Sequence, residues 1–83
     1  MPMARVVLLD PFAARFFGGR EEVEVAAETV FALVRALDAL APGFAVAAEE
    51  GAAIALDGVA LADWGTALAT DSEVLFVPRV AGG

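Results

Sequence analysis

One segment of this chain repeats its apolar residues with a helical period, and this limits the folds available to the chain. In residues 30–40, VFALVRALDAL, the apolar side chains fall on one stripe: Val30, Leu33, Val34 and Leu37, with Leu40 at its margin. Thr29 is a suitable N-cap, and Pro42-Gly43 marks the end of the helix. A single helix of this length covers only one face of a sheet. The rest of the chain must therefore supply a small sheet with one face left open.

Two short strands are expected before this helix. Residues 5–10 form an apolar run that ends at Pro11, which is typical of a buried strand. In residues 22–25, glutamates alternate with valines, which predicts a half-buried strand with the valines inward and an antiparallel pairing with the first strand. Between them, FAARFF at residues 12–17 spaces its aromatic side chains for one or two helical turns before Gly18-Gly19.

The second half of the chain reads as short strands. Residues 44–53, FAVAAEEGAA, show no clear pattern and are expected to be irregular. Asp57-Gly58 between two apolar runs predicts a hairpin, because a two-residue turn of this kind needs positive φ. Asp71-Ser72 predicts a second turn before a last strand at residues 73–77. The expected fold class is α+β, with one domain over residues 1–77 and a tail over residues 78–83.

The open face of this sheet is a candidate partner surface. The chain has 83 residues, of which 60% are hydrophobic, so some apolar surface is expected to stay outside so small a core. Residues 6–9 and 74–77 are apolar at both strand parities. Phe76 could anchor a partner on this face, although an aromatic residue in a final strand is at least as often part of the core.

Composition excludes several functions. The net charge of −7, with five arginines and no lysine, argues against a nucleic-acid partner and favours a basic protein surface. Without Cys, His or Tyr, the chain lacks thiolate nucleophiles, imidazole bases and most metal ligands, so a stand-alone enzyme or a metal site is not expected. No apolar run reaches the roughly 18 residues of a membrane span, and we expect a cytoplasmic protein without a membrane partner.

The order of these elements, together with the terminal Gly82-Gly83, resembles the β-grasp ubiquitin-like proteins and, more narrowly, the MoaD/ThiS sulfur carriers. The resemblance rests on FFGGREEVEV, ETVFALVRAL with PG, ALDGVAL and DSEVLFVPRVAGG. Within that family, the tail is most similar to that of the small subunit of molybdopterin synthase. That subunit often has two prolines before the valine, whereas this chain has Arg79 at the second position. Carriers that serve thiamine or cysteine synthesis also end in Gly-Gly and stay in consideration.

The resemblance implies a protein whose reactive group is its own terminus. The Gly83 carboxylate would be adenylated by a ubiquitin-activating-like enzyme that uses ATP, and sulfur would then displace AMP to give a thiocarboxylate. The large subunit of molybdopterin synthase would receive the tail and pass the sulfur to cyclic pyranopterin monophosphate. No cofactor would stay bound to the chain itself. A ubiquitin-like interaction module that never carries sulfur is the alternative from another class.

The tail has the properties that such chemistry needs. Gly83 leaves the acyl carbon uncrowded, and Gly82 lets the backbone pass a narrow channel. Pro78 cannot donate to a ladder and should end the last strand, after which an extended chain to Gly83 would reach roughly 20 Å. Pro78, Arg79, Val80 and Ala81 are the candidate partner contacts in this segment. Arg79 could pair with an acidic partner group or steady the adenylated terminus, or it could be an ordinary solvated arginine.

Overall fold

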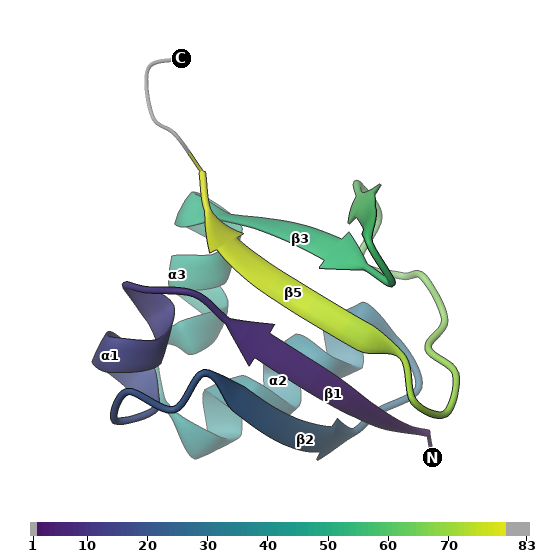
Figure 1. Cartoon of the computed structure of the whole chain (residues 1–83), viewed down its shortest axis with the longest axis horizontal. Coiled ribbons are helices and arrows are strands. Elements are labelled where there is room, and N and C mark those ends of the chain that lie inside the picture. The colour runs from purple at the N-terminus through teal and green to yellow at the C-terminus, as the bar shows by residue number, and fades with distance from the viewer. Residues whose placement is uncertain (1, 80–83) are drawn as a thin grey trace.

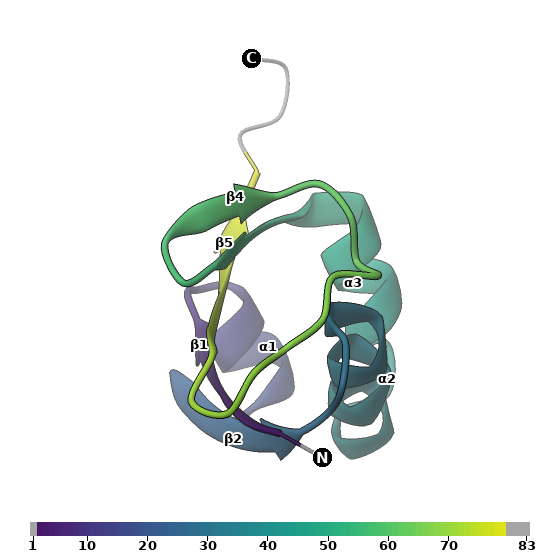
Figure 2. The ribbon, with the colours of Figure 1, turned by 90° about the vertical axis from the view of Figure 1, so that its right-hand side faces the viewer.

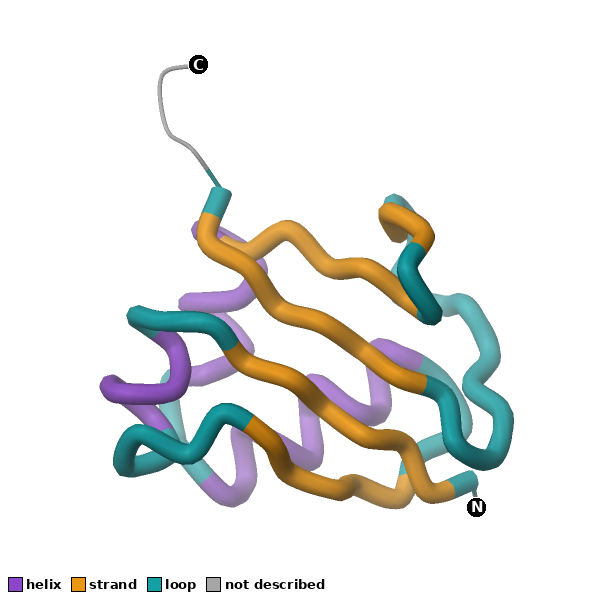
Figure 3. The backbone as a smooth tube through the Cα atoms, viewed as in Figure 1, coloured by secondary structure: helices purple, strands orange, loops and turns teal. Residues whose placement is uncertain are grey.

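The computed structural model describes residues 2–79, which form a five-stranded mixed sheet with three helices (Figure 1; Figure 3). In chain order the elements are β1 (Met3–Leu8), α1 (Phe12–Phe16), β2 (Glu22–Ala26), α2 (Val30–Leu40), α3 (Phe44–Gly51), β3 (Ala52–Leu56), β4 (Val59–Leu61) and β5 (Glu73–Pro78). The expected α+β class is confirmed.

The sheet places the last strand of the chain at its centre. The strand order is β2-β1-β5-β3-β4, with β1 parallel to β5 and all other neighbours antiparallel. The expected antiparallel pair of β1 and β2 is confirmed, with Ala4 opposite Val25 and Val6 opposite Val23. The expected hairpin joins β3 to β4, and its residues Asp57 and Gly58 have φ values of 50° and 84°. Since β5 pairs with both β1 and β3, it links the two halves of the sheet.

Helix α2 forms as the sequence predicts. The Thr29 hydroxyl oxygen accepts a hydrogen bond from the Ala32 backbone N–H at 3.1 Å, which satisfies one of the unpaired donors at the start of the helix. All four residues of the main stripe are buried: Val30, Leu33, Val34 and Leu37. Leu40, placed at the margin of the stripe, is 69% exposed and lies outside the core. Figure 2 shows α2 and α3 on the same side of the sheet.

The expectation that residues 44–53 are irregular is wrong, because they contain α3 and the start of β3. The cap of α3 comes from the preceding helix: Asp38 Oδ1 accepts from the backbone N–H of Gly43 at 3.1 Å and of Ala45 at 3.0 Å. Gly43 itself has φ of 98° and no side chain to act as a cap. The residues next to the start of α3 therefore carry no N-cap signal from which the sequence could predict the helix.

The core centres on Phe44, the first residue of α3, which is fully buried. Four other aromatic rings meet its ring edge-to-face, with centroid distances of 5.3 to 6.3 Å: Phe12, Phe16, Phe17 and Phe76. The aromatic residues of the α1 region are thus part of the main core, which joins α1, α3 and β5.

Candidate functional site

The helices lie on one side of the sheet and leave its other face open (Figure 2). Apolar residues of three strands share this open face. The register aligns Val7, Leu75 and Ala55 in one row across β1, β5 and β3, and Val77 lies opposite Ala53 in the next row. None of these five side chains is fully buried. We call them the open-face patch. The apolar open face expected from the two-parity strands is therefore present on the described part of the chain, and its use as a partner surface stays a prediction.

Phe76 does not belong to this patch, which corrects its assignment as a partner-binding residue. Its side chain is fully buried, and its ring packs against that of Phe44 at a centroid distance of 5.3 Å. The parallel register places Phe76 opposite Leu8, which is also buried. Because successive strand residues point to opposite faces, Leu75 and Val77 are the apolar residues of β5 that lie on the open face. The sequence could not show this, since residues 74–77 are apolar at both parities.

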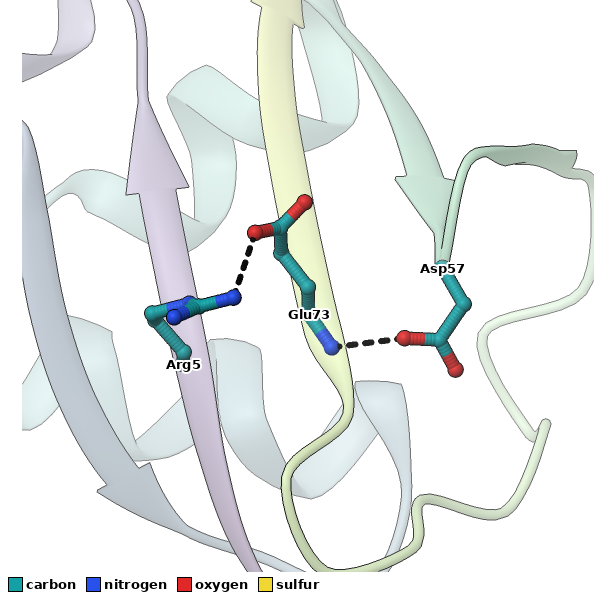
Figure 4. Close-up of polar contacts among 3 residues, drawn as sticks. All are labelled: Arg5, Asp57 and Glu73. Atoms are coloured by element: carbon teal, nitrogen blue, oxygen red, sulfur yellow. Dashed lines mark hydrogen bonds and ion pairs between the residues drawn. The ribbon is translucent and has the colours of Figure 1, made fainter.

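Charged side chains border the open-face patch near the N-terminal ends of β1 and β5. Arg5 donates to the Glu73 carboxylate at 2.9 Å across the parallel pair (Figure 4). Glu22 and Glu24 of β2 pair with Val7 and Arg5 in the register, so they lie on the same face. Three carboxylates and one guanidinium give this margin a negative balance. A partner with basic side chains around an apolar centre would complement it.

The end of β5 next to this margin is fixed by the hairpin. The Glu73 backbone N–H donates to the Asp57 carboxylate at 2.8 Å (Figure 4). In return, the Asp57 backbone N–H donates to the Glu73 carbonyl oxygen at 2.8 Å. Asp57 lies in the left-handed region, which aspartate tolerates better than most residues. These reciprocal bonds connect the β3–β4 turn to Glu73, the first residue of β5. They therefore hold the acidic margin in place relative to the open-face patch.

The opposite end of β5 is the point where the tail leaves the described structure (Figure 1). Pro78 lies opposite Ala52 and is the last residue of the strand, as its missing N–H predicts. Both Pro78 and Arg79 are exposed. Arg79 bonds to the end of α3: its N–H donates to the Gly51 carbonyl oxygen at 2.8 Å, and its Nη2 donates to the carbonyl oxygens of Glu49 and Glu50. The simple reading of Arg79 as a solvated side chain is thus incomplete.

The other predicted tail residues, Val80, Ala81, Gly82 and Gly83, lie outside the described residues. Beside the start of the tail, a groove of about 350 Å³ runs between α1 and α3. Its lining includes Pro11, Arg15, Val46, Glu50 and Pro78. Val46 is 58% exposed and gives this groove an apolar side chain that is open to solvent.

Within residues 2–79, no three His, Cys, Asp or Glu side chains converge in a way that could hold a metal ion. None of the described helices has the length and apolar character needed to cross a membrane. The candidate features of this region are an apolar sheet face with an acidic margin and a central strand that leads into the tail.

This combination of a five-stranded mixed sheet with helices on one face defines a β-grasp, ubiquitin-like protein. Residues 11–83 match the model of the ThiS family. The chain therefore belongs to the ThiS family of ubiquitin-like sulfur carriers. No curated protein sequence matches the chain.

Solved structures show the same fold at low sequence identity. CysO from Mycobacterium tuberculosis has a TM-score of 0.83 at 18% identity, with 93% of this chain and 99% of that chain covered. SAMP1 from Haloferax volcanii has a TM-score of 0.76 at 24% identity, with 98% and 99% covered. A complex of subunits 1 and 2 of molybdopterin-converting factor from Helicobacter pylori 26695 contains a chain with a TM-score of 0.67 at 24% identity, with 98% and 99% covered. At these identities, the likeness establishes the fold alone.

Proposed function

We propose that this chain is the small subunit of a molybdopterin synthase and carries sulfur as a thiocarboxylate on Gly83. The observation that carries the proposal is the family match, which extends through Gly82-Gly83 at the end of the sequence. An adenylating enzyme would transfer AMP from ATP to the Gly83 carboxylate, releasing pyrophosphate. A sulfur donor would then displace AMP from the acyl carbon. The chain has no cysteine or histidine, so partners would supply every activating side chain.

The structure supports separate roles for the domain and the tail. The open-face patch and its acidic margin offer a docking surface for a partner, and β5 passes directly from this surface into Pro78 and the tail. A partner that binds the open face would therefore also receive the segment that ends in Gly83. The Helicobacter pylori neighbour is a complex of subunits 1 and 2 of molybdopterin-converting factor, which supports a large-subunit partner for this chain.

Intact mass tests the carrier chemistry. The chain is incubated with a candidate adenylating enzyme, ATP and a sulfur donor, and is then treated with a thiol alkylator. We expect a single alkylated adduct that is absent without ATP and absent from a variant lacking Gly83. Because the chain has no cysteine, alkylation separates a thiocarboxylate from oxidation of Met1 or Met3, which adds nearly the same mass. If competent activating enzymes produce no adduct, the carrier function is rejected.

A second experiment tests the pathway. The thiocarboxylated chain is mixed with cyclic pyranopterin monophosphate and a molybdopterin synthase large subunit, and the dithiolene product is measured. Formation of that product supports the proposed pathway. Sulfur transfer that occurs only to a precursor of thiamine or of cysteine would keep the carrier chemistry and reject the molybdopterin role.

An interaction module that carries no sulfur is the second candidate, and the open-face patch is the observation that favours it. Such a module would bind its partner through Leu75 and Val77 whether or not Gly83 is present. Partner binding that persists in the Gly83 deletion, together with no adduct in the mass experiment, would support this alternative.

A further inference from the structure

The carboxyl end of α3 is completed by a residue from another element. The last four carbonyl groups of an α-helix have no partner within the helix. In α3, the Ala48 carbonyl oxygen accepts from the Ala52 N–H, and the next three carbonyls all bond to Arg79. The distances from Arg79 are 2.9 Å to the Glu49 oxygen, 2.7 Å to the Glu50 oxygen and 2.8 Å to the Gly51 oxygen.

Charge makes this contact specific for a basic residue. A helix carries a partial negative charge at its carboxyl end, where basic side chains are favourable and acidic ones are not. The last turn of α3 has no basic residue and contains Glu49 and Glu50. Arg79 brings the missing positive charge from the end of β5. A hydrogen bond from a charged guanidinium is stronger than one between neutral groups.

The contact also moves the last anchored residue of the chain from Pro78 to Arg79. Pro78 is paired with Ala52, and Arg79 is bonded to α3 through both its backbone and its side chain. Four residues follow Arg79 in the sequence. Fully extended, they span at most about 14 Å, compared with the roughly 20 Å expected if the tail began at Pro78. The exit point of the tail is thus one residue beyond the strand.

We propose that Arg79 is a positioning residue for sulfur transfer, because its bonds to α3 fix the point and direction from which the tail reaches a partner. This inference rests on the proposed carrier function. It requires that the partner's reaction centre lie within about 14 Å of Arg79 in the complex, because the carboxyl carbon of Gly83 can reach no farther. Without these bonds, residues 78 and 79 gain conformational freedom, and ordering them again on each turnover makes productive insertion of the tail rarer.

The test compares three variants. Arg79→Met removes the charge and the side-chain donors to Glu49 and Glu50, while keeping the backbone N–H and a long side chain. Arg79→Lys keeps the charge and a donor. Arg35→Met removes the same charge from an exposed position on α2 and is the matched control. Each chain is assayed for thiocarboxylate formation at varied chain concentration with a candidate adenylating enzyme, and amide hydrogen exchange is measured in each variant.

For Arg79→Met we expect kcat to fall roughly tenfold with KM little changed, as the loss of one or two ordered residues would predict. Arg79→Lys should recover most of the rate, and Arg35→Met should match the wild type. The amide of residue 79 should exchange at least about tenfold faster in Arg79→Met, while the amide of Val6 in the core stays protected. A rise in KM with unchanged kcat would overturn the proposal, because Arg79 would then contact the partner directly.

Unchanged kinetics in Arg79→Met, or unchanged exchange at residue 79, would also overturn the proposal. The exchange measurement needs no sulfur chemistry. If wild-type chain never forms the alkylatable adduct, the carrier function fails while the exchange data still decide whether Arg79 holds the end of β5 against α3.

Discussion

At the residue scale, a few side chains stabilise the fold through contacts with residues of other elements. Phe44 joins three elements through its ring, Asp38 caps a helix to which it does not belong, and Arg79 completes the other end of that same helix. Each contact combines residues that are separated in the sequence. Their energetic contributions can be measured one at a time.

Phe44→Ala should be the most destabilising single change in the core. It removes a fully buried ring and the edge-to-face contacts with four other aromatic rings. We expect the free energy of unfolding to fall by about 3–5 kcal/mol, a large part of the stability of a domain of this size. Urea denaturation measures the change, with Phe31→Ala as the control, since Phe31 is 53% exposed. Equal losses in the two variants would contradict the central role of Phe44.

Gly58 and Gly51 should respond to alanine in opposite ways. Neither position has an atom within 4 Å of an added Cβ, so backbone conformation decides the outcome. Gly58 has φ of 84°, and Gly58→Ala should cost roughly 1–2 kcal/mol. Gly51 lies in α3 outside the left-handed region, and Gly51→Ala should stabilise the protein by about 0.4–1 kcal/mol. Thermal unfolding distinguishes them; shifts of the same sign would argue against this account.

At the element scale, α3 depends on its neighbours at both ends. The N–H groups of its N-cap residue Gly43 and of Ala45 donate to Asp38 of α2. Its last carbonyls accept from Arg79, which follows β5. Short helices have little stability of their own, because forming the first turn is costly. Phe44 and Ala48 supply its buried face, one turn apart. This helix is therefore a product of tertiary contacts more than of local preference.

Asp38→Ala should loosen α3 while leaving α2 intact. It removes the acceptor for the N–H groups of Gly43 and Ala45, a loss of about 0.5–2 kcal/mol for a helix cap. Asp38→Asn keeps a side-chain oxygen and should retain most of the stability. Amide exchange of α3 relative to α2 reports the effect. Equal loosening of both helices would show that the bonds do not act on α3 specifically.

At the scale of the whole molecule, the two faces of the sheet differ in what covers them. Helices bury one face, while the other presents the open-face patch beside an acidic margin, and the tail starts from the central strand. The Arg5–Glu73 pair at this margin is exposed, and such a pair contributes at most about 1 kcal/mol to stability.

Leu75→Gln should weaken partner binding without unfolding the domain. The change places a polar group at the centre of the open-face patch, between Val7 and Ala55. We expect affinity for the adenylating enzyme to fall at least about tenfold, as for a central interface residue. Leu40→Gln is the control, because Leu40 is 69% exposed at the end of α2. Titration calorimetry measures both; equal affinities would place the partner surface elsewhere.

The sequence alone determined the elements whose signals are local. The cap and apolar stripe of α2, the alternating valines of β2 and the Asp57-Gly58 hairpin all depend on residues within a few positions of one another. The order of these elements and the Gly82-Gly83 end were enough to indicate the β-grasp fold and the ThiS family, which the comparison confirmed.

The tertiary structure decided what depends on pairing between distant segments. Residues 74–77 are apolar at both parities, so only the register with β1 and β3 shows that Phe76 faces the core and Leu75 faces outward. The helix α3 could not be predicted because both of its ends are completed by residues from other elements. Arg79 looked like a solvated side chain for the same reason: its acceptors lie about thirty positions earlier in the chain and meet it only after β5 pairs with β3.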